Sequence, residues 1–340
     1  MLFVAGCPPA LSSPRAPAFE AQLARGEREL RHGRFEAAAR AFDEAARAAR
    51  RRVDVDEALY RRARALKRAG DIAGALAVLD ALAARRPPSR RTARALFDAA
   101  RLRDERLRDT TGALRGYEAV VRHHPEEGPA ARALALWLAH VRRRSHAEAL
   151  ALVVSLQIDL GATDLGDDLL MAEHRLRLQQ GDRAGARTAL ERLVRTHPYP
   201  QGHRWDEALL RLADMDLEEG RAEAAIERLQ ALLERAEGTT LVGSYTLPAF
   251  PLAQLRIARI HRDYTGDFRA AREAYRSLER DFPHSRLCDD ARVELGELLL
   301  DRGELAAGCR ILRSALADFE VGAARRRATR RLAADCAPAP

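Results

Sequence analysis

The sequence contains few aromatic side chains and almost no lysine. Of its 340 residues, 5% are Phe, Trp or Tyr, whereas 47% are hydrophobic and 32% are charged. Lys67 is the only lysine among 58 basic residues, so the net charge of +8 comes almost entirely from arginine. No apolar stretch approaches the roughly 20 residues that a helix needs to cross a bilayer. The abundance of Ala, Leu, Arg and Glu instead favours helices that pack closely through small side chains.

The short motifs that accompany catalysis are also missing. The sequence has no GxSxG, no HExxH, no phosphate-binding glycine loop and no dinucleotide fingerprint. His197 and His203 flank two prolines, but no carboxylate-rich neighbourhood completes a metal site around them. We therefore predict no catalytic residues, no cofactor and no metal.

Four cysteines are present, and their spacing predicts neither a metal site nor a full set of disulfides. There is no CxxC pair among Cys7, Cys288, Cys309 and Cys336. Cys288 is expected at the start of one helix and Cys309 inside the next, which places these two thiols too far apart to bond. If Cys7 is modified, three thiols remain, and an odd number cannot all pair.

A glycine followed by a polar residue recurs before Ala-rich segments. It stands at Gly33, Gly70, Gly181, Gly220, Gly266 and Gly303. The separations include 37, 39 and 37 residues, and the 111 residues from Gly70 to Gly181 hold three periods of 37. Two degenerate units, turning near Arg108 and Arg144, fill that interval. A period of this length predicts a solenoid of stacked helix pairs.

Within each unit the residues suit two helices joined at the glycine. Glycine tolerates the left-handed backbone that ends a helix. In the second helix, Phe35, Ala38 and Phe42 are spaced by three and four residues and share one face. Several units end on proline, where a helix must stop.

These features resemble the tetratricopeptide-repeat (TPR) family. The segment FPHSRLCDDARVELGELLLDRGE is similar to the F-P-x-S…A…L-G pattern of bacterial envelope TPR lipoproteins of the barrel-assembly and Tol–Pal type. The resemblance implies an all-α solenoid of about eight helix-turn-helix units. We expect a Pro/Ser/Ala segment over 1–18, the solenoid over 19–321 with an insertion at 236–252, and a basic C-terminal cap and tail over 322–340.

The resemblance also implies which residues meet a partner, because the first helix of each TPR unit lines the concave groove. The residues carried over to this groove are Tyr60, Arg64, Lys67, Arg68, Met171, Arg175, Arg256, Asp290, Glu297 and Asp301. The groove is then basic in its early units and acidic in its last one, which suits an extended peptide bound in one orientation. The alternative is an ordinary solvated face of mixed charge.

The insertion at 236–252 interrupts the helical pattern. It contains Thr-Thr, Gly-Ser and two prolines, and we expect Tyr245 and Phe250 to be exposed loop contacts for a partner. The alternative is a longer connector whose apolar side chains cover the neighbouring units.

The stretch VAGC at residues 4–7 resembles a bacterial lipobox, in which the cysteine is lipidated and becomes the mature N-terminus. A signal peptide also needs a basic region and an apolar stretch of 7–15 residues. Only six residues precede Cys7, so we expect the true translation start to lie upstream. The alternative is an untethered protein whose N-terminus happens to contain a cysteine.

We thus expect a non-catalytic scaffold that binds protein or peptide partners, held by lipid to the periplasmic face of a bacterial envelope membrane, the outer membrane among the candidates. The alternative is a cytoplasmic TPR adaptor or regulator, and its basic run at 324–331 offers a contact to nucleic acid. Nucleic acid is otherwise not favoured, because arginine near helix C-termini complements the helix dipole. The sequence identifies neither the partner nor the oligomeric state.

Overall fold

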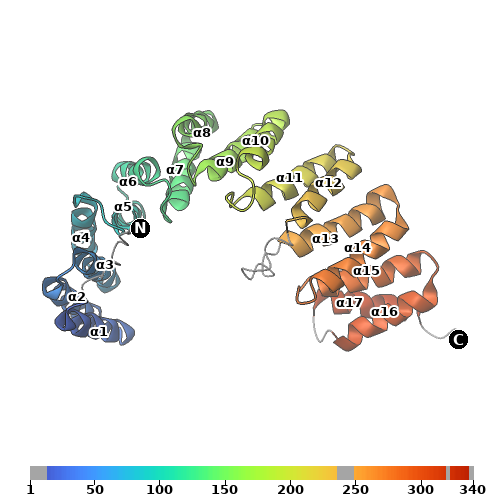
Figure 1. Cartoon of the computed structure of the whole chain (residues 1–340), viewed down its shortest axis with the longest axis horizontal. Helices are drawn as coiled ribbons and strands as arrows, with labels where there is room; N and C mark the ends of the chain where they lie inside the picture. Colours follow the sequence, from blue (N-terminus) through green and yellow to red (C-terminus); the bar gives the residue numbers. More distant parts are fainter. Residues whose placement is uncertain (1–13, 236–248, 319–321, 337–340) are drawn as a thin grey trace, which may run out of the picture. The chain divides into compact units, whose positions relative to one another are not determined.

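The computed structural model describes residues 14–235, 249–318 and 322–336 (Figure 1). All regular secondary structure in these ranges is helical. The chain divides into two compact units, one up to Leu165 and one from Gly166 onward.

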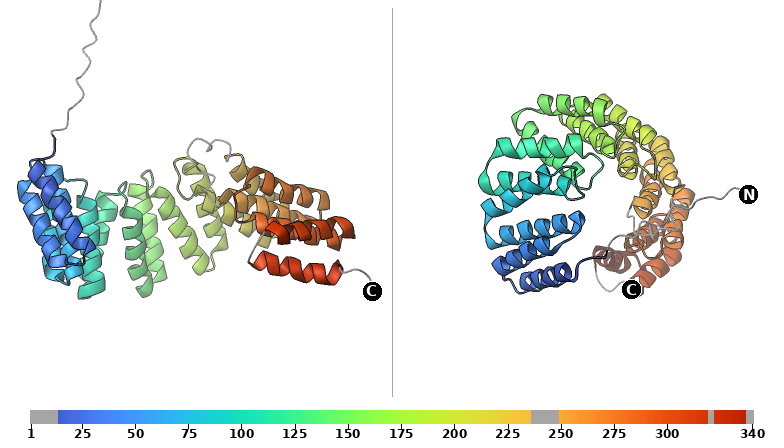
Figure 2. Two further views of the ribbon diagram at one scale, coloured as in Figure 1. Left: turned by 90° about the horizontal axis from the view of Figure 1, so that it is seen from below. Right: turned by 60° about the vertical axis from the view of Figure 1, so that its left-hand side comes forward.

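The first unit consists of four helix pairs. Its helices are α1 (Pro17–Arg31), α2 (Phe35–Ala48), α3 (Arg52–Ala69), α4 (Ile72–Ala84), α5 (Thr92–Leu102), α6 (Thr110–His123), α7 (Ala130–Arg144) and α8 (His146–Leu160). A π-helical turn, Arg103–Leu107, extends α5. Each helix packs against its neighbours in sequence, and the paired helices run antiparallel (Figure 2).

The second unit consists of four further pairs and a last single helix. Its helices are α9 (Gly166–Gln179), α10 (Arg183–Thr196), α11 (Trp205–Glu218), α12 (Ala222–Leu233), α13 (Ala249–Ile260), α14 (Phe268–Asp281), α15 (Cys288–Asp301), α16 (Leu305–Asp318) and α17 (Ala323–Asp335). A π-helical turn, His261–Thr265, extends α13. The predicted all-α solenoid of eight helix pairs is confirmed.

The turn inside each pair lies where the sequence period places it. All six repeating glycines have positive φ, for example 89° at Gly70 and 82° at Gly303. Arg108, at the predicted turn of the third pair, has φ 55° and is the one non-glycine residue with positive φ in the described ranges. The fourth pair turns differently, because Ser145 is extended and directly joins α7 to α8.

Aspartate begins the second helix of several pairs. The carboxylates of Asp71, Asp109, Asp182 and Asp267 each accept the backbone N–H three residues later, at 2.8–2.9 Å. These N-caps satisfy backbone donors that have no partner within the helix. The Gly-Asp sequence therefore specifies the end of one helix and the start of the next.

The core of each unit contains several hydrophobic clusters that join one helix pair to the next. Phe42 of α2 is fully buried and packs with Ala38, Ala39 and with Ala65 of α3. Small residues at these contacts let the helix backbones approach closely. Since each pair shares its core with the next, stability depends on stacking.

Helix α17 packs against α15 and α16 at the end of the second unit (Figure 1). Ala324 and Ala328 are its buried residues, and a disulfide joins Cys309 of α16 to Cys336, the residue after α17, with 5.8 Å between the Cα atoms. The sequence did not predict this bond. Cys288 is buried and free.

The structure corrects one expectation about the insertion. Phe250 lies in α13, is 5% exposed and belongs to the core shared by α11–α15. Its side chain therefore packs inside the unit and is not an exposed contact. Tyr245 and the rest of 236–248 lie outside the described residues, as does Cys7.

Within the described ranges, no helix is both long enough and apolar enough to cross a membrane.

Candidate functional site

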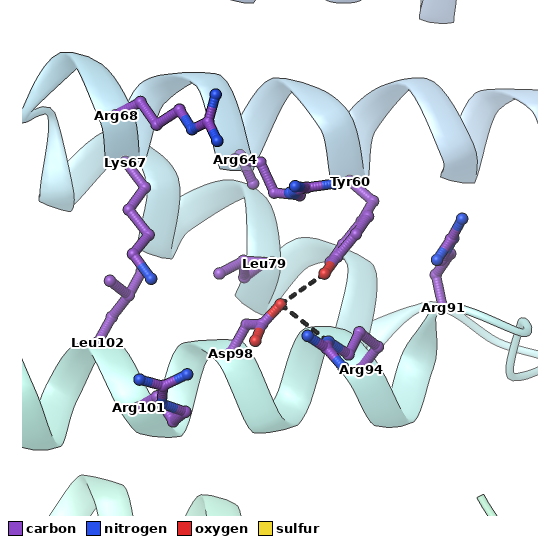
Figure 3. Close-up of a pocket in the computed structure, with 11 residues that line it drawn as sticks. Tyr60, Arg64, Lys67, Arg68, Leu79, Arg91, Arg94, Asp98, Arg101 and Leu102 are labelled. Carbon is purple, nitrogen blue, oxygen red and sulfur yellow. Dashed lines mark hydrogen bonds and ion pairs between the residues drawn. The ribbon is translucent and has the colours of Figure 1, made fainter. Parts of the chain in front are cut away.

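A cavity of about 520 Å³ lies between α3 and α5, the first helices of two successive pairs (Figure 3). Ala63, Leu79 and Leu102 are buried and form an apolar floor. The other lining residues are Tyr60, Arg64, Lys67, Arg68, Arg91, Arg94, Asp98 and Arg101. Six cations thus surround a single carboxylate. Four of the predicted groove residues, Tyr60, Arg64, Lys67 and Arg68, come together here.

Asp98 holds the two sides of the cavity together. The Tyr60 hydroxyl donates to Asp98 Oδ2 at 2.6 Å, and Arg94 Nε donates to the same oxygen at 3.3 Å (Figure 3). Burial and this hydrogen bond to Asp98 raise the pKa of Tyr60, so its hydroxyl stays protonated and remains the donor. The carboxylate is therefore already engaged and leaves the surrounding cations in excess.

Each cation on the α5 side of the cavity has a carboxylate partner within the protein. Arg91 Nε donates to Glu57 Oε2 at 2.8 Å, and its guanidinium lies 4.8 Å from the centre of the Tyr60 ring. Arg101 Nε donates to Glu105 Oε1 at 2.8 Å. These three residues, Arg91, Arg94 and Arg101, are thus held in place by pairs within the protein.

The cations of α3 differ, because no carboxylate holds them. The charged ends of Arg64 and Lys67 have no hydrogen bond or ion pair in the described part of the chain, and Arg68 stacks on Phe35 at 5.9 Å. Arg64 and Arg68 are exposed. These three side chains therefore remain available to bind an anion in the cavity.

Residues of α5 were missed by the sequence analysis, although a signal for one of them exists. Asp98 precedes the turn at Arg108 by as many residues as Tyr60 precedes the turn at Gly70. The third unit has a weak repeat pattern, and its groove positions were not assigned. The equal spacing from the turn indicates that Asp98 occupies the position in α5 that Tyr60 occupies in α3.

In the second unit the predicted groove residues are engaged within the protein or buried. Met171 of α9 is 1% exposed and packs against residues of α10 and α11. Its prediction as a partner-binding residue was therefore wrong. Arg175 pairs with Glu207 at 2.9 Å, and Arg256 pairs with Asp214 at 2.8 Å. Both ion pairs join the first helices of successive helix pairs.

Two of the three acidic residues predicted at the end of the groove pair with arginines of the last helix. Arg327 of α17 pairs with Glu297, and Arg331 pairs with Asp301. Asp290 is half-buried in the first turn of α15. Glu297 and Asp301 therefore neutralise two arginines of the last helix.

The buried carboxylate of Asp216 in α11 binds several arginines and links α11 to the neighbouring helices. Asp216 accepts from Arg221 at 2.7 Å and from Arg228 at 2.5 Å. Burial alone would raise the pKa of Asp216, but these hydrogen bonds outweigh burial and lower it. In the described residues no group of three or more His, Cys, Asp and Glu side chains is arranged to hold a metal ion.

Comparison with known proteins identifies the repeat. A family model described as tetratricopeptide repeat matches residues 23–90, 172–239 and 260–323, more than half of the sequence. The chain belongs to the tetratricopeptide-repeat family. The matched segments cover the second, sixth and eighth pairs and most of the first, fifth and seventh. The weak third and fourth pairs, α5 to α8, lie outside them.

Several solved TPR structures are similar to this chain at low sequence identity. A tetratricopeptide repeat protein from Parabacteroides merdae is 16% identical, with 71% of this chain and 86% of that one aligned at a TM-score of 0.41. The C-terminal part of a TPR repeat-containing protein from Cytophaga hutchinsonii is 12% identical, covering 80% and 98% at 0.46. PilW, a widely conserved type IV pilus biogenesis factor, is 18% identical, covering 68% and 96% at 0.39. No curated protein matches the sequence significantly.

Proposed function

We propose that this TPR protein is a non-catalytic scaffold of the bacterial cell envelope, anchored by lipid on Cys7 and exposed to the periplasm. TPR arrays generally act in protein–protein interaction, through surfaces built from successive helix pairs. The scaffold presents the cavity between α3 and α5 to a partner protein. No step of bond making or breaking is part of this role.

The disulfide between Cys309 and Cys336 carries the proposal for the compartment. Disulfides persist in oxidising compartments such as the bacterial periplasm and are rare in the cytosol. The lipobox-like VAGC segment points to the same side of the membrane. A cytoplasmic adaptor would have to keep this bond in a reducing environment.

The arginines of the C-terminal basic run do not favour the nucleic-acid alternative. Arg327 and Arg331 are paired with Glu297 and Asp301 of α15. Arginines that neutralise carboxylates of their own protein contribute little to phosphate binding. We therefore assign these two arginines of the basic run to the packing of α17.

Membrane fractionation tests the anchor. The protein expressed from its native gene is expected in the membrane fraction, and Cys7→Ser is expected to release it to the soluble fraction. The soluble variant should keep the far-UV spectrum of the parent protein. An unchanged membrane partition of Cys7→Ser would contradict lipid anchoring.

Photo-cross-linking in cells tests the scaffold role. A cross-linking residue at Arg68, beside the cavity, is expected to give defined protein adducts. The same residue at Arg115, an exposed position of α6 outside the cavity lining, is expected to give none of these adducts. Absence of adducts from Arg68, or equal adducts from both positions, would contradict partner binding at this surface.

A further inference from the structure

We propose that the cavity between α3 and α5 binds an internal acidic segment of a partner protein, in extended conformation, through side-chain carboxylates at alternate positions. This inference rests on the proposed scaffold function and adds the chemistry of the partner.

The charge of the cavity is positive even after its internal ion pairs are subtracted. Arg91, Arg94 and Arg101 each have a carboxylate partner, whereas Arg64, Lys67 and Arg68 have none in the described residues. Arg91 and Arg94 also lie at the first turn of α5, where the helix dipole is positive. The site therefore attracts an anion.

The spacing of the free cations suits two carboxylates on one extended chain. Arg64, Lys67 and Arg68 stand at positions i, i+3 and i+4 of α3 and so lie on one face, about 4.5–6 Å apart along the axis at 1.5 Å per residue. In an extended peptide, side chains at i and i+2 point the same way and are about 6.6 Å apart. Two alternate Glu or Asp residues can thus reach Arg64 and Lys67 or Arg68 together. A single chain-terminal carboxylate would engage only part of this row.

The cavity is less suited to nucleic acid. Single-stranded binding uses aromatic faces on which bases stack. The Tyr60 ring is covered by the Arg91 guanidinium, and its hydroxyl is tied to Asp98. Three free cations also neutralise only about three phosphates, which supplies a small part of the affinity of nucleic-acid proteins.

The cavity floor gives the bound segment a second contact. Ala63, Leu79 and Leu102 are the buried apolar residues of the cavity lining, and the methylene groups of the two acidic side chains can pack on them. The cavity volume of about 520 Å³ lies within the range of about 300–1,000 Å³ found for ligand pockets. The residue between two acidic ones points away from the cavity, so the preferred segment alternates acidic and small residues.

Peptide binding to the full chain tests the proposal directly. The probe is a short fluorescent peptide in which Glu alternates with Ala, with both ends chemically blocked, measured by fluorescence anisotropy. We expect saturable binding that weakens with salt, and no binding of the matching Gln–Ala peptide. A peptide of the same composition with its glutamates in adjacent pairs should bind more weakly.

Charge-neutralising variants locate the site. Arg64→Gln with Lys67→Gln is expected to weaken binding of the Glu–Ala peptide about tenfold or more, since hydrogen bonds to charged groups contribute about 1.5–3 kcal/mol. The matched control, Arg40→Gln with Arg115→Gln, removes the same charge from exposed positions of α2 and α6 that do not line the cavity. The control is expected to bind normally. An equal loss in both double variants would contradict a localised site.

The remaining outcomes separate the possible ligands. Binding that requires a free C-terminal carboxylate, or that inorganic phosphate or a single-stranded oligonucleotide inhibits at lower concentration than the peptide itself, would overturn the proposal. Cross-linking from Arg68 separates this result from failure of the scaffold role. Adducts that persist in the Arg64→Gln, Lys67→Gln background would keep the scaffold and reject the acidic ligand, whereas absence of adducts from the parent protein would reject the scaffold.

Discussion

The ring of Phe42 in α2 lies directly against the Cα atom of Gly26 in α1. A Cβ atom added at Gly26 would be 2.5 Å from the Phe42 ring, closer than real Cβ contacts come. Phe42 is fully buried, and α1 and α2 therefore approach closely only because residue 26 has no side chain. The contact explains why glycine occurs inside the first helix of the first pair.

Gly26→Ala is accordingly expected to destabilise the first unit. Overpacking of a filled core costs about 1–3 kcal/mol, which exceeds the small gain of alanine over glycine in a helix. Gly128→Ala is the control, because Gly128 has nothing within 4 Å of an added Cβ and no positive φ. Urea unfolding followed by circular dichroism measures both. A Gly26→Ala protein as stable as the control would contradict the close contact.

The left-handed turns predict opposite effects at two equivalent positions. Gly70 has φ 89° and Arg108 has φ 55°, although both end the first helix of a pair. Gly70→Ala is expected to lower the free energy of unfolding by about 1–2 kcal/mol, because a non-glycine residue is strained in the left-handed conformation. Arg108→Gly is expected to stabilise by about 0.5–1 kcal/mol, because the same relief exceeds the added chain entropy of glycine, about 0.5–1 kcal/mol. Shifts of the same sign in urea unfolding would contradict the assignment of these turns.

Most of the fold could be predicted from local sequence, because a few adjacent residues determine each turn between paired helices. The glycine spacing specifies every pair but the third and fourth, and in those Arg108 and Ser145 still mark the turn. Helix pairs that contact only their neighbours need no long-range information.

The sequence predicted the residues on the α3 side of the cavity but not those on the α5 side. Arg64 and Lys67 follow from the repeat register, whereas Asp98 lies in a unit whose pattern is weak. The burial of Met171 and Phe250 depends on which neighbouring helix packs over them, and the register alone does not contain this information. The disulfide depends on where α17 docks, which the repeat does not encode.

Glu294 predicts a pH dependence of the second unit. This buried carboxylate accepts from Arg259 at 2.7 Å and from the Tyr275 hydroxyl at 3.0 Å. Burial by itself would raise the pKa of Glu294, but these hydrogen bonds outweigh burial and lower it. Its stabilising contribution is therefore complete above the pKa of an unfolded glutamate, about 4.3, and is lost as the pH falls through the lower pKa of the folded state.

Glu294→Gln tests this dependence. The variant leaves the partly exposed guanidinium of Arg259 and the buried Tyr275 hydroxyl without their anionic acceptor. It is expected to lose about 1–3 kcal/mol at neutral pH. It should also lose less further stability than the parent protein on acidification. Glu273→Gln is the control, because Glu273 is 62% exposed and its pair with Arg280 contributes about 0–1 kcal/mol. Equal stability of the two variants at neutral pH would contradict a structural role for Glu294.

The disulfide predicts a definite number of reactive thiols. In a Cys7→Ser background, only Cys288 is expected to react with a thiol reagent in denaturant without reductant, and all three remaining cysteines after reduction. Burial raises the pKa of Cys288, so this thiol should stay unreactive in the folded protein.

Cys336→Ser removes the disulfide, which closes 27 residues of chain, and is expected to cost about 3 kcal/mol of stability, measured by urea unfolding. Since only two alanines of α17 are buried, this helix should then become the first site of tryptic cleavage, and reductant should produce the same cleavage in the parent protein. Three reactive thiols in the unreduced denatured protein would show that the bond does not form, and the periplasmic assignment would lose its main support.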